Sequence, residues 1–430
     1  MQREFIALTL LVVTNFSPQA SPACDNLASS VSRDVTAAPQ RPAVIWHDTE
    51  RIIFLGGTFI ERAQRFGYLE TAIVRRLPGN TINVRNLGWS GDTVFAESRG
   101  IFDPPAKGYA RMLDQVRGLK PTVIVLAYGV NESFAGTAGL PRFLKQLGQL
   151  IEDLNPTQAQ IVLASPHWHA TAPPPLPDPT TRNKNLELYI QALTKYAEQH
   201  KLPFLNLRRV LSTTEQSAAI KLTDNGIHPN AAGYWNCAEL VAEQLIGPTA
   251  KTEAGQWQVE IDAGGQVRQS LGTRLDQIQV QRGTLKWRVR DRHLPAPRFG
   301  KIARHARRLK ITGLPAGNYV LKIDGQPVAH GSAAEWSQSR TLDNGPEFAQ
   351  AEQLRRTIVA KNLNYFHRWR PQNVTYLFGF RKHEQGQNAK EVAEFDALVR
   401  NAETRIRALS KPQDHSYEIV ASPCEERVRP

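Results

Sequence analysis

Five short segments rich in β-branched residues constrain the fold of this chain more than any other feature. They are residues 51–55, 81–84, 122–126, 160–164 and 203–206. The stretches between them are long enough to hold a helix. Strands that alternate with helices in this way predict a parallel α/β sheet with helices on both faces.

Polar motifs follow these strands and indicate where a site would lie. Gly56-Gly57-Thr58 follows the first strand, Asn86 to Thr93 the second, and Gly129 to Glu132 the third. Ser165 to His169 follows the fourth, and Asp224 to Pro229 lies beyond the fifth. Because the ligand crevice of such a sheet lies at the carboxyl ends of its strands, the motifs predict one shared site.

The residue types in these motifs fit acyl transfer. Thr58 supplies a hydroxyl nucleophile, and His228 can take its proton. The N–H of Gly91 and the amide of Asn131 can hold the oxygen of the reacting carbonyl as it becomes negative. The glycines let the backbone approach that carbonyl closely.

The order and spacing of the motifs resemble those of the SGNH, or GDSL-like, hydrolase family from about residue 50 to residue 245. The usual family blocks are Gly-Asp-Ser, a glycine-bearing second block, Gly-x-Asn-Asp and Asp-x-x-His-Pro. Residues 86–93, 129–132 and 226–230 look like the last three. The resemblance implies a flavodoxin-like three-layer fold and hydrolysis of carboxylic esters. Its implied substrates are O-acyl or acetyl groups on carbohydrate, or lysophospholipid-type esters.

Two departures from the family pattern fall on catalytic positions. Gly57-Thr58 stands where the family has Asp-Ser, and Asn225 stands where it has the Asp three residues before His228. Asn225 can hydrogen-bond an imidazole, but it cannot stabilise the imidazolium by charge and can favour the wrong tautomer. In a serine-protease triad this exchange lowers turnover by about 10⁴. Asp224, one residue away, is an alternative carboxylate.

Several interpretations of Thr58 therefore stay open. It can be the nucleophile, it can line a binding site with little or no turnover, or Ser90 or Ser133 can be the nucleophile instead. A structural alternative is a helix cap, because Thr58 and Glu61 form the Thr-x-x-Glu capping-box pattern. The competing function is a catalytically reduced carbohydrate- or envelope-binding protein on the same scaffold.

Further motif residues are predicted to contact the substrate. These are Gly57, Trp89, Ser90, Glu132, His167 and His169. Two histidines at i and i+2 on a loop are weak evidence for a metal when no Cys or carboxylate cluster lies at ligand spacing. We therefore predict neither a metal nor a cofactor.

The length of the chain requires more than one core. It has 430 residues, 41% of them hydrophobic, whereas one core seldom grows past roughly 250–300 residues. We predict a hydrolase-like domain at 45–247, a β-sandwich-like module at 255–340 and a helical segment at 346–410 that packs back on the first domain. The strand-like runs of the module are 257–261, 286–290, 309–312 and 319–323, with a hairpin signal at Asp324-Gly325.

Apolar residues at helical spacing predict helices over 346–369 and 392–409. The segment between them is dense in Arg, His and aromatic residues and resembles the tail of GDSL-like proteins from planctomycete-type bacteria. Arg370, Arg381 or His383 could bind an anionic group of the substrate. The alternative is that stacked arginines and aromatics join the helices to the first domain.

The net charge of +13 lies mainly in the second half of the chain. Residues 251–430 contain 30 Lys and Arg against 19 Asp and Glu. The densest stretch runs from Arg282 to Lys310, and its residues 286–290 alternate charged with apolar side chains, which predicts a strand with one basic face. An exported protein rarely meets nucleic acid, so the predicted partner is an anionic glycan or envelope surface, and the alternative is a solvated face.

The amino terminus predicts export. Arg3 precedes an apolar run over 5–13, and Ala20 to Ala23 is a small-residue exit, which together are typical of a signal peptide over 1–23. The mature chain would begin near Cys24 in a secreted or periplasmic protein, with lipid attachment at Cys24 as a weaker alternative. No other segment has the ~18 apolar residues of a transmembrane helix.

Export permits disulfides, and the chain has three cysteines. Cys24 and Cys424 lie near the two ends of the sequence and could pair. Cys237 would then remain as a small buried apolar residue.

Overall fold

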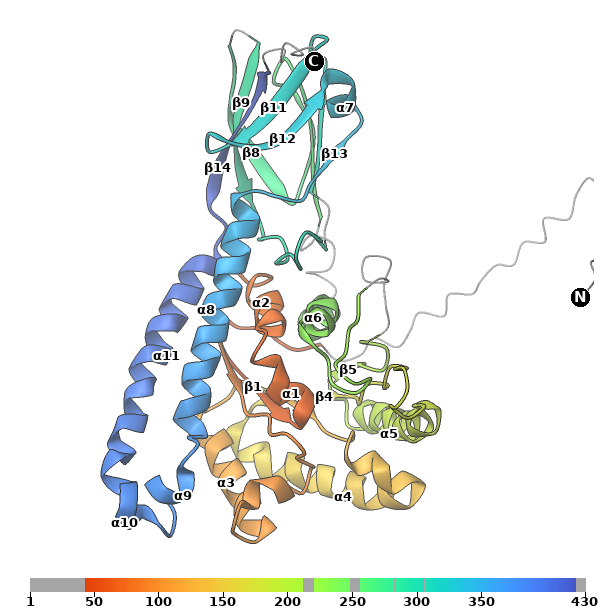
Figure 1. Ribbon diagram of the computed structural model, residues 1–430, viewed down its shortest axis with the longest axis vertical. Coiled ribbons are helices and arrows are strands. Elements are labelled where there is room, and N and C mark those ends of the chain that lie inside the picture. Colours follow the sequence, from red (N-terminus) through yellow and green to blue (C-terminus); the bar gives the residue numbers. More distant parts are fainter. Residues whose placement is uncertain (1–42, 212–219, 248–255, 282, 305–306, 423–430) are drawn as a thin grey trace, which may run out of the picture. The chain divides into compact units, whose positions relative to one another are not determined.

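The computed structural model describes residues 43–211, 220–247, 256–281, 283–304 and 307–422 (Figure 1). The predicted signal peptide, Cys24 and Cys424 lie outside these residues. Cys237 is a buried free thiol, and burial raises its pKa to about 12. No helix in the described part of the chain is long and apolar enough to cross a membrane.

A five-stranded parallel sheet is the centre of the first part of the chain (Figure 1). Its strands are β1 (Thr49–Gly56), β2 (Thr81–Asn86), β3 (Val123–Ala127), β4 (Gln160–Ala164) and β5 (Phe204–Leu205). The order is β2-β1-β3-β4-β5, and all pairings are parallel. The predicted α/β fold is confirmed. Strand order reverses at β1, so the predicted crevice lies beside its carboxyl end.

Helices cover both faces of this sheet. They are α1 (Thr58–Ala63), α2 (Tyr68–Val74), α3 (Pro105–Gly118), α4 (Gly136–Leu154), α5 (Thr180–Gln199) and α6 (Ala231–Ile246), with 3-10 turns η1 (Glu97–Gly100), η2 (Glu132–Ala135) and η3 (Asn155–Thr157). Ile52 and Phe54 of β1 share a core with α1, α2 and α6. Ile53 and Leu55 share the opposite core with α3, α4 and α5. Both faces of β1 are thus buried, which explains its continuous apolar run.

Two further sheets enclose a third core. Their strands are β6 (Trp257–Asp262), β7 (Val267–Leu271), β8 (Thr273–Gln281), β9 (Thr284–Asp291), β10 (Arg307–Thr312), β11 (Asn318–Ile323), β12 (Gln326–Ser332), β13 (Arg340–Leu342) and β14 (Asp414–Ala421), and the short α7 (Ala333–Ser337) precedes β13. The sheet orders are β13-β10-β6-β7 and β12-β11-β14-β9-β8. Trp257 and Leu309 of one sheet pack in the same core as Trp287 and Tyr417 of the other.

The strand β14 is a feature that the sequence did not predict. It lies after the C-terminal helices in the sequence, yet it pairs between β11 and β9 at the middle of the five-stranded sheet. The module therefore consists of two segments that are far apart in the chain.

The basic strand predicted at 286–290 has the expected alternation, since Trp287 and Val289 of β9 are buried. However, Arg288 and Arg290 both pair with Asp276 of β8 and with Asp414 of β14. Neighbouring strands therefore neutralise much of the predicted basic face.

Two long helices, α8 (Pro346–Trp369) and α11 (Ala389–Ser410), pack side by side as a hairpin that we call the helical arm (Figure 1). The short elements α9 (Val374–Leu377), α10 (Lys382–Gln385) and η6 (Gly386–Asn388) connect them. Leu354 and Ile358 of α8 are fully buried in the core shared with α1, α2 and α6.

A buried ion pair joins the arm to the parallel sheet. Lys361 of α8 is 1% exposed and donates to the Glu70 carboxylate of α2 at 2.7 Å and to the Val84 carbonyl oxygen of β2 at 2.9 Å. Burial raises the pKa of Glu70 and lowers the pKa of Lys361, while each partner's charge opposes that shift. The two side chains therefore depend on each other.

We predict that Lys361→Met lowers the free energy of unfolding by about 3–5 kcal/mol, because it leaves the Glu70 charge buried without its partner. The double variant Lys361→Met/Glu70→Leu is expected to recover most of the loss. Arg356→Met, which breaks an exposed pair with Glu352 on the same helix, should cost less than about 1 kcal/mol. Denaturant unfolding measures the unfolding free energy of all three variants. Equal losses for Lys361→Met and Arg356→Met would contradict the view that Lys361 and Glu70 depend on each other.

Candidate active site

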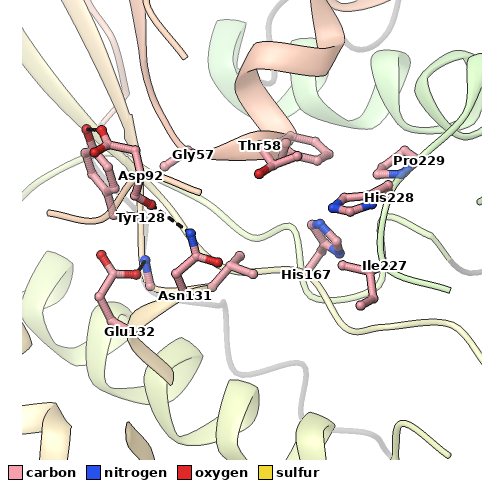
Figure 2. A pocket seen from close by; sticks show the side chains of 14 residues that line it. Gly57, Thr58, Asp92, Tyr128, Asn131, Glu132, His167, Ile227, His228 and Pro229 are labelled. Atoms are coloured by element: carbon pink, nitrogen blue, oxygen red, sulfur yellow. Dashed lines mark hydrogen bonds between the residues drawn. The ribbon is translucent and has the colours of Figure 1, made fainter. Parts of the chain in front are cut away.

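One pocket lies at the carboxyl ends of β1, β3 and β4 and beside the loop before α6 (Figure 2). Its cavity volume is about 60 Å³. A water molecule needs about 10–15 Å³ of such space, so only a small group fits inside. The lining residues that the sequence predicted for the site are Gly57, Thr58, Asn131, Glu132, His167 and His228. Asp92, which the sequence analysis did not select, lines it as well.

Thr58 is the first residue of α1, whose N-cap is Gly57, and no side chain caps this helix. The alternative in which Thr58 and Glu61 form a capping box is therefore wrong. The Thr58 hydroxyl oxygen instead accepts a hydrogen bond from the Gly91 N–H at 3.1 Å. The predicted nucleophile and one predicted oxyanion donor are thus in direct contact.

The loop that carries Gly91 lies tightly against α1. A Cβ at Gly88 would come within 2.2 Å of the Glu61 backbone nitrogen, so a side chain does not fit there. Gly91 has a φ of +74°, which L side chains rarely adopt. Asn86 fastens the start of the loop, because its side chain donates to the Ile60 carbonyl oxygen at 2.6 Å and accepts from the Gly88 N–H at 2.9 Å.

The third motif is fixed against this loop. Asn131 donates one amide hydrogen to the Asp92 carbonyl oxygen at 2.9 Å, and the same nitrogen carries a second hydrogen that can bind a ligand oxygen. The Glu132 carboxylate accepts the N–H groups of Val94 and Gly129 at 2.7 and 2.8 Å. Burial raises the pKa of Glu132 to about 7. Glu132 therefore connects the two loops, a role that the sequence did not indicate.

His228 contacts Asn225, with 3.2 Å between its Nδ1 and the Asn225 Nδ2. The side-chain oxygen of Asn225, Oδ1, already accepts the N–H groups of Ile227 and His228, at 3.2 and 3.0 Å. The amide nitrogen must therefore face the ring, and because it can only donate, Nδ1 accepts. The neutral ring then carries its proton on Nε2, which is the nitrogen that a general base needs free.

Asp224 does not take over the position of Asn225. Its carboxylate pairs with Arg62 of α1, which also donates to the Pro229 carbonyl oxygen at 3.5 Å. Arg62 therefore ties the loop of His228 to the helix of Thr58. Burial, and then the charge of Arg62, lower the pKa of His228, while Asp224 opposes them, so the ring is neutral near pH 7.

His167 presents the opposite tautomer. Its Nδ1 lies 3.2 Å from the Trp168 carbonyl oxygen, which can only accept, so Nδ1 carries the proton and Nε2 has a lone pair. Burial lowers the pKa of His167 to about 4. His169 is not among the residues that line the pocket, and burial lowers its pKa to about 3.

The two alternative serines do not line the pocket. Ser133 is fully buried, and its hydroxyl donates to the Val130 carbonyl oxygen at 2.7 Å and accepts from Arg182 at 2.8 Å. Ser90 is exposed, and its backbone N–H donates to the Glu61 carboxylate. This placement favours Thr58 over both serines.

The three residues of the helical arm that were predicted to bind the substrate, Arg370, Arg381 and His383, do not lie together. The guanidinium of Arg370 lies 3.5 Å from the ring centre of Trp89, beside the loop of Gly91. Arg381 donates to the Tyr376 hydroxyl at 2.7 Å and pairs with Glu384, and His383 is exposed. None of these three residues lines the pocket, and Arg370 alone contacts a loop of the site.

Potential metal ligands do not gather in the described residues, where no group of three or more His, Cys, Asp or Glu side chains could hold an ion. The groups that line the pocket include the Thr58 hydroxyl, the imidazoles of His167 and His228, the Asn131 amide and the carboxyl groups of Asp92 and Glu132.

Comparison with known proteins identifies the domain. The model of the GDSL-like lipase/acylhydrolase family matches residues 59–235. The predicted resemblance to the SGNH, or GDSL-like, hydrolases is confirmed for this part of the chain. Apart from the changes at Gly57-Thr58 and Asn225, its motifs and its fold are those of hydrolases that act on ester bonds. No curated protein matches the chain.

One solved structure shares the fold of most of this chain, and others are similar to a part of it. A gut microbial diltiazem-metabolizing enzyme is similar over 89% of this chain and 100% of its own, with a TM-score of 0.66 and 17% identity. An acetylxylan esterase from Geobacillus stearothermophilus covers 46% of this chain and 95% of its own, with a TM-score of 0.36 and 19% identity. A GDSL-like lipase from Bacteroides thetaiotaomicron covers 45% and 85%, with a TM-score of 0.31 and 22% identity. The first likeness extends well beyond residues 59–235.

We predict that Asn225→Asp raises ester hydrolysis, by up to about 10⁴. One carboxylate oxygen can keep the backbone N–H groups while the other accepts from the His228 Nδ1–H, which frees Nε2. The ¹⁵N shifts of the His228 ring should move from the Nε2–H to the Nδ1–H tautomer. Asp224→Asn, which alters the adjacent carboxylate, should produce no gain. A folded Asn225→Asp protein with an unchanged tautomer would contradict this account.

We also predict that Glu132 makes the protein less stable as the pH rises. Its pKa of about 7 in the folded protein is above the ordinary value of 4.5, so its stabilising contribution is complete below pH 4.5 and is lost as the pH rises through 7. Glu132→Gln should reduce the fall in unfolding free energy between pH 4.5 and 8 by about 3 kcal/mol. Unfolding curves across this range measure it, and the exposed Glu97→Gln should keep the wild-type slope.

Proposed function

We propose that this protein hydrolyses carboxylic esters with a short acyl group, carried by a hydroxyl-bearing molecule such as an O-acetylated carbohydrate. The observation that carries the proposal is the hydrogen bond between the Thr58 hydroxyl and the Gly91 N–H, in a pocket that His228 also lines. A nucleophile and an oxyanion donor must lie this close, because the carbonyl oxygen is bonded to the carbon under attack. The small cavity favours acetyl-sized groups over the chains of lysophospholipid-type esters.

In the first step the Thr58 oxygen attacks the carbonyl carbon, and the carbonyl electron pair moves onto oxygen. The Gly91 N–H and the second amide hydrogen of Asn131 bind that oxygen, so Gly91 exchanges its bond to Thr58 for one to the oxyanion. The Thr58 proton passes to His228 Nε2 and then to the oxygen of the departing alcohol. Water later cleaves the acyl-Thr58 ester by the same route in reverse and releases the acid.

These reaction steps require the His228 tautomer with its proton on Nδ1, which Asn225 disfavours. Moving the proton to Nδ1 places it against the Asn225 amide hydrogens, and turning the amide would place those hydrogens against two backbone N–H groups. Either change loses hydrogen bonds, so we expect slow turnover compared with an Asp-bearing site.

The second candidate is a binding protein with little turnover, and the same amide supports it. His228 donates through Nε2 and His167 can accept through Nε2, so the two rings suit a ligand hydroxyl or ester oxygen without bond cleavage. O-acylated carbohydrate is the ligand that we propose for both candidates.

We infer further that the protein acts outside the cytoplasm, as a secreted or periplasmic protein. The signal-peptide pattern of residues 1–23 supports this location. The positive charge of residues 251–430 supports contact with an anionic glycan or envelope surface, although Arg288 and Arg290 are partly neutralised by Asp276 and Asp414.

The test is hydrolysis of acetyl, butyryl and octanoyl esters and of an O-acetylated oligosaccharide by the purified protein. We expect acetyl esters to be cleaved fastest, with at least a ~100-fold loss in Thr58→Ala and His228→Ala. Thr58→Ser should match or exceed the wild type, because it keeps the hydroxyl and removes a methyl group from a small pocket.

The outcomes separate the two candidates. Loss of activity in Ser90→Ala with Thr58→Ala unaffected would move the nucleophile and refute the proposed mechanism. No hydrolysis by any folded form, together with calorimetric binding of the acetylated oligosaccharide that His167→Ala abolishes, would establish the binding protein instead.

A further inference from the structure

We propose that Arg370, at the C-terminal end of α8, holds in place the loop that carries Trp89, Ser90 and Gly91, which we call the oxyanion loop. Arg370 is then a positioning residue for the acyl transfer. The inference rests on the proposed function for its kinetic consequence, although the contacts themselves do not depend on it. Arg370 lies outside residues 59–235, where the family model matches. The site would therefore be completed by a part of the chain beyond that match.

The first set of contacts surrounds Trp89, two residues before Gly91. The Arg370 guanidinium carbon lies 3.5 Å from the Trp89 ring centre, and that of Arg99 lies 5.6 Å from it. Trp369 meets the same ring edge-on, with 6.0 Å between ring centres. Two cationic groups and an aromatic ring thus restrict the movement of Trp89.

The second set converges on one carboxylate oxygen. Glu61 Oε2 accepts the Ser90 N–H and also pairs with Arg370 Nη1 at 3.3 Å. Glu61 lies on α1, one turn after Thr58, and its side chain is 9% exposed. This oxygen therefore connects the nucleophile's helix, the oxyanion loop and the helical arm.

The geometry of Gly91 depends on this junction. Its N–H is the next along the backbone after that of Ser90, and it donates to the Thr58 hydroxyl at 3.1 Å. An oxyanion donor has to lie about 2.7–3.1 Å from the developing charge. A displacement of ~1 Å can cost about 10²-fold in rate. A small shift of Ser90 would therefore be measurable in turnover.

Arg370 supplies the positively charged partner of Glu61. Without it, Glu61 would lose a charged partner, which is costly for a carboxylate that is only 9% exposed. The arm presents Arg370 from a fixed position, because Lys361 of the same helix is bonded to Glu70 and to the Val84 carbonyl oxygen. With one guanidinium hydrogen bonded to Glu61 and its face against Trp89, Arg370 is engaged with the loop rather than aimed into the pocket.

The test compares Arg370→Met with Arg356→Met in the full protein. Arg356 is on the same helix and also pairs with a glutamate, Glu352, but it is exposed at the surface. For acetyl ester hydrolysis we expect Arg370→Met to lower kcat by about 10- to 100-fold with KM nearly unchanged. Arg370→Lys, which keeps the charge for Glu61, should recover part of the loss, and Arg356→Met should stay within about two-fold of wild type.

Amide hydrogen exchange supplies a readout that needs no turnover. The Ser90 and Gly91 amides should exchange at least ten-fold faster in Arg370→Met, with intermediate rates in Arg370→Lys and wild-type rates in Arg356→Met. If the wild type hydrolyses no ester, the proposed function fails, but this measurement still decides the positioning role. Should Arg370→Met not fold, Arg370→Lys carries the comparison.

Three results would overturn the inference. The first is unchanged exchange at Ser90 and Gly91 in a folded Arg370→Met protein. The second is an equal effect of Arg370→Met and Arg356→Met, which would indicate a general loss of stability. The third is a rise in KM with kcat intact, which would make Arg370 a substrate contact.

Discussion

The candidate site depends on parallel backbone pairing, which brings the carboxyl ends of neighbouring strands to one edge of the sheet. The register pairs Gly56 of β1 with Ala127 of β3, so the chain leaves both strands at the same level. Thr58 and Asn131 lie two and four residues beyond this pair. A Cβ at Gly56 would approach the Ala127 carbonyl oxygen to 2.4 Å, so the strands can lie this close only with glycine there.

On this frame, polar side chains that are buried or partly exposed set the geometry of the loops. Glu132 joins the loops after β2 and β3, Arg62 joins the loop of His228 to α1, and Glu61 joins α1 to the loop of Gly91. Each uses a carboxylate or guanidinium to satisfy backbone groups or a charge that would otherwise be costly to bury. The helical arm takes part through Arg370, while Lys361 holds the arm to the sheet.

Asn225 stands where the family has Asp, and the two side chains differ in the atom that faces the imidazole. That atom is an oxygen acceptor in Asp and a nitrogen donor in Asn. A carboxylate has two acceptors, one for the backbone and one for the imidazole. An amide has one acceptor, which the N–H groups of Ile227 and His228 occupy, so the imidazole meets a donor. The fold can therefore coexist in one chain with a histidine whose Nε2 carries the proton.

The five strands of the parallel sheet, their motifs and the two arm helices could be predicted from the sequence, because local periodicity and turn residues specify them. The sequence did not determine that β14 enters the sandwich, because pairing between segments far apart in a chain has no local signature. Residue types at the strand ends, together with the resemblance to the GDSL-like family, predicted Thr58, Gly91, Asn131 and His228. The donor and acceptor roles of Asn225, His228 and His167 followed only from the folded chain. The same holds for the separation of Arg370 from Arg381 and His383. Those outcomes depend on which atoms meet across the fold, and the order of residues does not encode that locally.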